Sequence, residues 1–174
     1  EAQVEMVDGK IAHIYPYGTK EVDVDYGDER VVPGFIDVHT HGAYGFDTND
    51  GDEEGLRNWA KRIPADEGVT SFCPTTITQS VEVLTHALEN IVNVWDAGYE
   101  GAEMVGIHFE GPYLDTKFKG AQPEEFILNS SLDQFKEYCR VAKNRIKVVT
   151  VAPEHDTDFQ LIKYCAENKI TASM

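Results

Sequence analysis

From residue 33 to residue 174 the chain alternates between short apolar runs and segments whose apolar residues recur at helical spacing. The runs have the length of strands, and the segments between them repeat at i, i+3, i+4 and i+7, as one buried helix face does. Steady alternation of this kind indicates parallel strands joined by helical crossovers. Strands are expected at 32–41, 68–74, 104–110, 146–152 and 170–174, and helices at 56–64, 80–98, 131–142 and from 157.

The number of strand–helix units indicates a particular α/β architecture. The chain holds about four and a half units, and eight units would need roughly 250 residues, the usual size of a closed (β/α)₈ barrel. We therefore predict the first half of a (β/α)₈ TIM-type barrel, which stops within its fifth strand at Met174. An open, doubly wound sheet shares the same local signals and remains the structural alternative.

Residues 1–32 follow a different pattern. An Asp8-Gly9 pair separates the apolar runs 4–7 and 11–15, and Asp-Gly between two such runs is a strong hairpin signal. A further alternation at 22–26 predicts a third short strand. Strands this short cannot bury a core alone, so we expect them to be part of a small β domain.

The charge balance excludes two classes of partner. The sequence has 15 Lys and Arg against 31 Asp and Glu, a formal net charge of −16, which argues against a nucleic-acid or anionic-membrane surface. Cys73, Cys139 and Cys165 are far apart and each lies in an apolar segment, as reduced, buried thiols do. The chain has no leader-like start and no apolar run of the roughly 18 residues that span a bilayer, so we expect a cytoplasmic protein.

Two histidines mark the end of the first predicted strand. His39 and His41 are separated by one residue, and because side chains alternate along a strand, both point to the same face. Gly42 ends the strand directly after them, at the carboxyl end where α/β proteins carry their chemistry. Imidazole nitrogen suits zinc and other borderline divalent ions, so the pair predicts a metal site.

A carboxylate ends the third predicted strand. Glu110 lies on the same face as His108 and is followed directly by Gly111-Pro112, which places it on the same rim as the histidine pair. Two imidazoles and one carboxylate make a plausible metal site with open positions for water. The alternative is that Glu110 caps the next loop and that the histidines are buried polar residues. We expect His108, deeper in the barrel, to be packed or to support a metal ligand rather than to bind a metal itself.

The stretch 111–130 is long for a connection between a strand and a helix and has no periodicity, so it is a candidate substrate loop. Within it, Gly120 and Ala121 would let backbone approach a ligand closely. The alternative is a solvated loop with scattered lysines. His155, just beyond the fourth predicted strand, is interpreted as a loop residue.

Several motifs together resemble a known family. The run 33–42, Pro-Gly-Phe-Ile-Asp-Val-His-Thr-His-Gly, resembles the first-strand signature of the amidohydrolase superfamily of metal-dependent barrel hydrolases. His-Phe-Glu-Gly-Pro-Tyr at 108–113, followed by Lys-Gly-Ala-Gln at 119–122, resembles the N-acetylglucosamine-6-phosphate deacetylases within it. The segments 68–76 and 151–154 are also similar to that family.

The resemblance implies an activity and a site. It implies hydrolysis of the acetamide of N-acetylglucosamine 6-phosphate, with Glu110 as a metal ligand and His39 and His41 binding a second ion. The cofactor would be one or two divalent ions of Zn, Fe, Mn or Co. Ala121 and Gln122 would contact the substrate, although many members have His at the position of Gln122. Residues 1–32 would belong to a small β-sandwich domain, 33–174 to the barrel, and the full-length protein would be a homodimer.

The rest of the family's machinery lies outside this sequence. Two further histidine ligands are expected beyond the fifth and sixth strands, and an Asp that acts as general base and acid near the last strand. The resemblance therefore implies that these residues hold no catalytic general base and are inactive alone. The alternatives are another amidohydrolase, such as one that opens a cyclic amide, and a non-catalytic metal-binding or assembly module.

Overall fold

The computed structural model describes residues 1–174, which divide into two compact units, Glu1–Pro33 and Gly34–Met174. The first unit holds an antiparallel hairpin of β1 (Ala2–Val7) and β2 (Lys10–Pro16). Its turn residues Asp8 and Gly9 both have positive φ, so the predicted hairpin is confirmed. The predicted strand at 22–26 is wrong. No neighbouring strand pairs with this segment, and an isolated extended segment leaves its amide groups to water.

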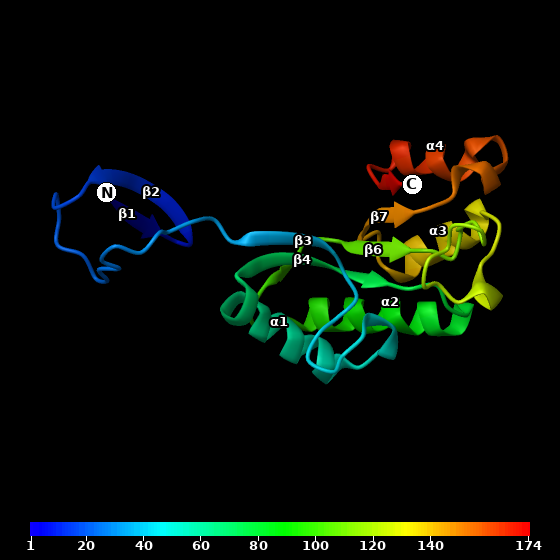
Figure 1. Ribbon diagram of the computed structural model, residues 1–174, viewed down its shortest axis with the longest axis horizontal. Coiled ribbons are helices and arrows are strands. Elements are labelled where there is room, and N and C mark those ends of the chain that lie inside the picture. The colour runs from blue at the N-terminus through cyan, green and yellow to red at the C-terminus, as the bar shows by residue number, and fades with distance from the viewer. The chain divides into compact units, whose positions relative to one another are not determined.

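The second unit is built on one curled parallel sheet (Figure 1). Its strands pair in chain order, β3-β4-β6-β7-β8, with the two-residue β5 beside β4. A doubly wound sheet reverses its strand order, whereas a barrel adds each strand on the same side of the last. The chain-order pairing therefore confirms the predicted half-barrel and excludes the open alternative. The strands are β3 (Phe35–Thr40), β4 (Val69–Thr76), β5 (Glu103–Met104), β6 (Ile107–Glu110), β7 (Ile146–Thr150) and β8 (Thr171–Ser173).

Four helices connect these strands, and side chains cap three of them. Asp52, Ser80 and Ser131 accept hydrogen bonds from backbone N–H groups of the first turns, which satisfies donors that would otherwise be unpaired. None of the helices combines the length and the apolar composition that a membrane span needs. The helices are α1 (Glu53–Glu67), α2 (Val81–Ala97), α3 (Leu132–Val141) and α4 (Gln160–Glu167), with 3₁₀ turns at Thr48–Asp50, Glu124–Phe126, Pro153–His155 and Thr157–Phe159.

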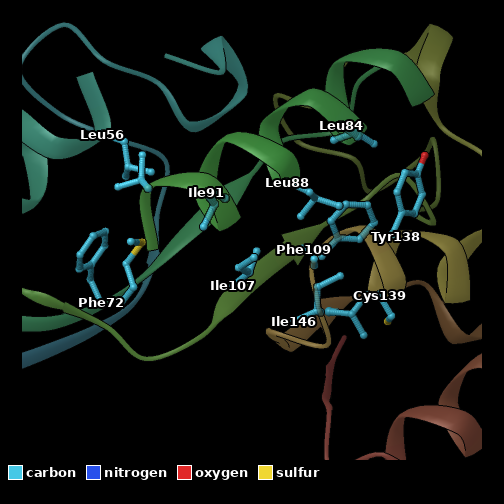
Figure 2. Packing of buried hydrophobic residues seen from close by; sticks show 14 of the residues in the cluster. Leu56, Phe72, Leu84, Leu88, Ile91, Ile107, Phe109, Tyr138, Cys139 and Ile146 are labelled. Atoms are coloured by element: carbon cyan, nitrogen blue, oxygen red, sulfur yellow. The ribbon is translucent and has the colours of Figure 1, made fainter. Parts of the chain in front are cut away.

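The core lies between the helices and the outer face of the sheet (Figure 2). Ile107 and Phe109 of β6 are fully buried in this layer. Because side chains alternate along a strand, His108 and Glu110 point to the opposite, concave face. The three cysteines are free and buried in the core, as predicted. The packing of one face of β6 thus fixes which of its residues face the inside of the barrel.

The first helix does not stop at Pro64, as the sequence predicted, but continues to Glu67 and ends at Gly68. A proline inside a helix removes the hydrogen bond to the carbonyl four residues before it. Here that carbonyl belongs to Ala60, and it accepts instead from the backbone N–H of Ala102 at 2.8 Å. The proline is tolerated because its missing donor is replaced from another segment.

Two further boundaries differ from the sequence pattern. The strand predicted at 104–110 is interrupted at residues 105–106 and so appears as β5 and β6. The fourth helix begins at Gln160 rather than 157, because Asp158 and Phe159 have positive φ values of 54°, which no right-handed helix contains. The Asp156 carboxylate then accepts from the N–H groups of Leu161 and Ile162 and so caps the helix from outside.

Candidate metal centre

The imidazoles of His39 and His41 lie next to each other at the end of β3. Their ring centroids are 5.1 Å apart with the planes nearly perpendicular. Nδ1 of His41 lies 3.1 Å from the carbonyl oxygen of Thr75 in β4. A carbonyl can only accept, so Nδ1 carries the hydrogen, which leaves the Nε2 lone pair of a neutral ring free. This second bond orients the ring, as such bonds do for histidine ligands in metal sites.

Glu110 at the end of β6 faces both histidines. Its Oε2 lies 3.2 Å from Nε2 of His41 and 3.8 Å from Nε2 of His39. Potential ligand atoms of all three residues lie within 4.8 Å of one another. The glutamate side chain is 18% exposed, and those of His39 and His41 are 47% and 33% exposed. The three groups therefore converge on one partly open point at the rim of the half-barrel.

The pKa shifts of His41 and Glu110 show that these two groups influence each other. The hydrogen bond with Glu110 raises the pKa of His41, although partial burial works against it. Burial alone would raise the pKa of Glu110, but the hydrogen bond with His41 and the nearby imidazoles outweigh it and lower that pKa. Each of the two groups thus favours the charged form of the other.

This donor set fits a divalent transition metal ion. Two imidazole nitrogens and one carboxylate oxygen are the ligands of many catalytic zinc and iron sites, which keep further positions open for water or substrate. Metal binding requires both groups to be deprotonated, so a cation and a proton on His41 would compete for the same place. His39, His41 and Glu110 are the residues that would hold such an ion.

His108 lies deeper in the half-barrel and has no free ring nitrogen. Its Nδ1 is 2.9 Å from the Val38 carbonyl and its Nε2 is 2.8 Å from Oγ1 of Thr150. Burial lowers its pKa, in spite of the bond to the carbonyl. The ring is 4% exposed and stacks edge-on against His39, with centroids 4.8 Å apart. His108 is therefore packed below the three convergent groups, as expected from its place in the strand.

The loop residues expected to contact substrate are not joined to these groups by any hydrogen bond. Ala121 is exposed, whereas Gln122 is 6% exposed. The Oε1 atom of Gln122 accepts from the backbone N–H of Thr78 at 2.8 Å, and Nζ of Lys119 donates to the Gln122 carbonyl at 3.0 Å. The Gln122 side chain thus ties the loop to the segment between β4 and α2.

One contact at the rim was not predicted. His155, interpreted from the sequence as a loop residue, has Nε2 2.7 Å from Oδ2 of Asp115. Glu154 lies close enough to make these three a second group of potential ligands. The only available signal was indirect: Asp115 and His155 each follow, by five residues, the paired strand residues Glu110 and Thr150. Strand pairing must be known before that spacing carries information.

Comparisons with known proteins give matches along nearly the whole chain. The model of the amidohydrolase family matches residues 30–171. The chain is 42% identical to N-acetylglucosamine-6-phosphate deacetylase from Bacillus subtilis (strain 168), over 96% of this chain and 44% of that protein. It is 32% identical to N-acetylgalactosamine-6-phosphate deacetylase from Escherichia coli O157:H7, over 97% of this chain and 44% of that protein.

Solved structures agree with the fold. The N-acetyl-D-glucosamine-6-phosphate deacetylase of Mycobacterium smegmatis superimposes with a TM-score of 0.88 at 23% identity, over 97% of this chain and 44% of that chain. The N-acetylglucosamine-6-phosphate deacetylase of Pasteurella multocida gives a TM-score of 0.76 at 30% identity, over 95% and 44%. The chain thus spans less than half the length of the relatives that it matches.

Proposed function

The chain belongs to the amidohydrolase family, as its motifs predicted, and on this basis we propose that it works as part of an N-acetylglucosamine-6-phosphate deacetylase. The reaction would release acetate and glucosamine 6-phosphate. The observation that carries the proposal is the convergence of His39, His41 and Glu110 in a chain whose relatives are named for this activity. Since the chain covers less than half of those relatives, the activity is proposed for the full-length protein.

The three convergent residues would serve as ligands. A divalent metal, when bound, supplies Lewis acidity toward a carbonyl and lowers the pKa of water. His39 and His41 would each present Nε2, and Glu110 would contribute the negative charge that offsets the cation. One or two ions of Zn, Fe, Mn or Co are compatible with imidazole and carboxylate donors. The Thr75 carbonyl would hold His41 in orientation through Nδ1.

We infer that the remaining chemistry would come from residues outside this chain. A hydrolase of this type needs a general base that takes a proton from water and passes it to the leaving amine. We infer that an Asp and two further histidine ligands of the full-length protein supply this part, so residues 1–174 alone would be inactive. Residues 1–32 would join a small β-sandwich domain, with 33–174 as half of the barrel.

The loop would contribute to substrate binding mainly through its backbone. Ala121 is exposed beside Gln122, whose side chain is already bonded to the Thr78 backbone. We infer that Gln122 holds the loop while the backbone around Ala121 approaches the phosphorylated sugar. We also infer that the full-length protein is cytoplasmic and forms a homodimer. Sedimentation would test the oligomeric state.

A substrate panel tests the assignment. The full-length protein would be assayed for acetate release from N-acetylglucosamine 6-phosphate and from N-acetylgalactosamine 6-phosphate, and for opening of a cyclic amide. The second sugar is included because one relative is named for it. Preference for N-acetylglucosamine 6-phosphate supports the proposal, preference for the other sugar would change its substrate, and turnover of the cyclic amide alone would refute it. A full-length protein that hydrolyses none of them would favour a metal-binding or assembly module.

A further inference from the structure

The peptide that joins Val38 to His39 is held by side chains rather than by the sheet. The pairing of β3 with β4 breaks off after Asp37 and resumes at Thr40, with a register shift between them. A register shift locally disrupts the ladder of backbone hydrogen bonds. The polar groups of the 38–39 peptide therefore need other partners.

Two side chains provide those partners. The carbonyl of this peptide, from Val38, lies 2.9 Å from Nδ1 of His108. Its N–H, from His39, donates to Oδ1 of Asp37 at 3.0 Å. Because a carbonyl cannot donate, Nδ1 of His108 must carry the hydrogen. The peptide plane is thus fixed on both sides, and the orientation of that plane sets the direction in which the His39 side chain leaves the strand.

His39 depends on this support more than His41 does. The ring of His41 is oriented by its own bond to the Thr75 carbonyl, whereas no hydrogen bond to the His39 ring is present. The contacts of the His39 ring are edge-on stacking against His108, at 4.8 Å, and against His41, at 5.1 Å, together with the 3.8 Å approach of its Nε2 to Oε2 of Glu110. His108 itself is anchored to β7 through Thr150, 2.8 Å from Nε2. It therefore links three strands at a buried point directly below the candidate ligands.

We propose that His108 is a positioning residue of the metal centre: by donating from Nδ1 to the Val38 carbonyl, it fixes the 38–39 peptide and so aims the His39 imidazole at the ion. The inference rests on the proposed function in one respect, namely that His39 binds a metal. It goes further in assigning a role to a histidine that binds neither metal nor substrate.

A pair of uncharged variants separates the two bonds of His108. The carboxamide of His108→Asn reaches the position of Nδ1 and can still donate to the Val38 carbonyl. The longer carboxamide of His108→Gln reaches toward Thr150 but not toward that carbonyl. Loss of a group that orients a metal ligand typically costs about 10- to 100-fold in metal affinity. We expect that loss for His108→Gln and an affinity close to wild type for His108→Asn.

The readout is cobalt binding rather than activity. Metal-free full-length protein would be titrated with Co²⁺, and both the dissociation constant and the visible absorption spectrum recorded, because the spectrum reports ligand geometry. The exposed His86→Asn on α2 is the matched control and should bind like wild type. Thermal unfolding of each metal-free variant shows whether a variant is folded. Should His108→Gln fail to fold, Asp37→Ala breaks the other bond of the same peptide and should weaken binding similarly.

A double variant shows whether the effect passes through His39. In a His39→Ala background, His108→Gln should cause little further loss of Co²⁺ affinity, because the residue that it positions is gone. Equal losses for His108→Asn and His108→Gln, or full additivity with His39→Ala, would overturn the inference and leave the metal centre standing. Failure of the wild-type protein to bind Co²⁺ at all would overturn the metal centre, and this inference with it.

Discussion

Nε2 of His41 lies 3.2 Å from Oε2 of Glu110, although their strands do not pair and β4 lies between them in the sheet. In a closed barrel the side chains of one interior layer come from alternate strands. Curling of the sheet therefore brings the ends of β3 and β6 together above β4. This contact turns a histidine pair and a distant glutamate into one site.

Metal affinity is predicted to fall as the pH is lowered through the pKa of His41. Glu110 raises that pKa above its ordinary 6.5, and a metal ion must displace the proton to bind. Below this pKa, affinity should weaken by about tenfold per pH unit for one displaced proton. The affinity for Zn²⁺ at each pH can be measured by competition with a chromophoric chelator, between about pH 5.5 and 8.5. An affinity that is flat across this range would contradict the pairing.

The same pair is predicted to stabilise the metal-free protein within a pH window. The raised pKa of His41 gives a contribution that is present below 6.5 and lost as pH rises through the folded-state value. The lowered pKa of Glu110 gives one that is present above 4.5 and lost as pH falls. Glu110→Gln should therefore lower the free energy of unfolding most between these values. Since the His41 side chain is 33% exposed, we expect about 1 kcal/mol or less.

Urea unfolding of metal-free wild type and Glu110→Gln would be measured at about pH 5.5, where the pair contributes, and at about pH 9, where its contribution is lost. Exposed Glu125→Gln is the matched control and should show no such pH dependence. A larger effect of Glu110→Gln at the higher pH would contradict the assignment.

Gln122→Ala is predicted to loosen the loop 111–130. The substitution leaves the buried N–H of Thr78 without its 2.8 Å acceptor, which costs about 1 to 3 kcal/mol of folding free energy. Gln122→Glu keeps an acceptor at the same place and should lose less. The exposed Gln160→Ala is the control. Limited proteolysis and thermal unfolding measure both effects, and cleavage within the loop that is no faster in Gln122→Ala than in wild type would contradict the tie.

Removal of the helix proline is predicted to bring little gain. Proline inside a helix normally costs about 3 kcal/mol, so Pro64→Ala would be strongly stabilising in an isolated helix. Here the Ala60 carbonyl already accepts from Ala102 at 2.8 Å, and the new N–H would compete for it. We expect a change of less than about 1 kcal/mol by urea unfolding. A gain near the full value would show that the Ala102 contact is unimportant.

The parts of the fold that follow from local periodicity were predictable from the sequence. The helical spacing of apolar residues predicted α2 and α3 correctly, at 80–98 and 131–142. The alternation around Glu110 correctly placed Glu110 and His108 on the same face of β6. Each of these features depends on residues a few positions apart.

The features that were missed depend on partners far away in the chain. Pro64 stays within its helix only because Ala102 supplies a donor, and the alternation at 22–26 forms no strand because no partner strand pairs with it. Two further contacts each join loops that follow different strands: Asp115 with His155, and Gln122 with Thr78. Spacing along the chain does not reveal such contacts until the strand order is known.

The most direct test is acetate release from N-acetylglucosamine 6-phosphate by the full-length protein, measured before metal removal, after removal by a chelator, and after return of a divalent ion. We predict that release stops on removal and returns with the ion in wild type, and that Glu110→Gln does not recover under the same conditions. Release that continues unchanged in the metal-free protein would contradict the account.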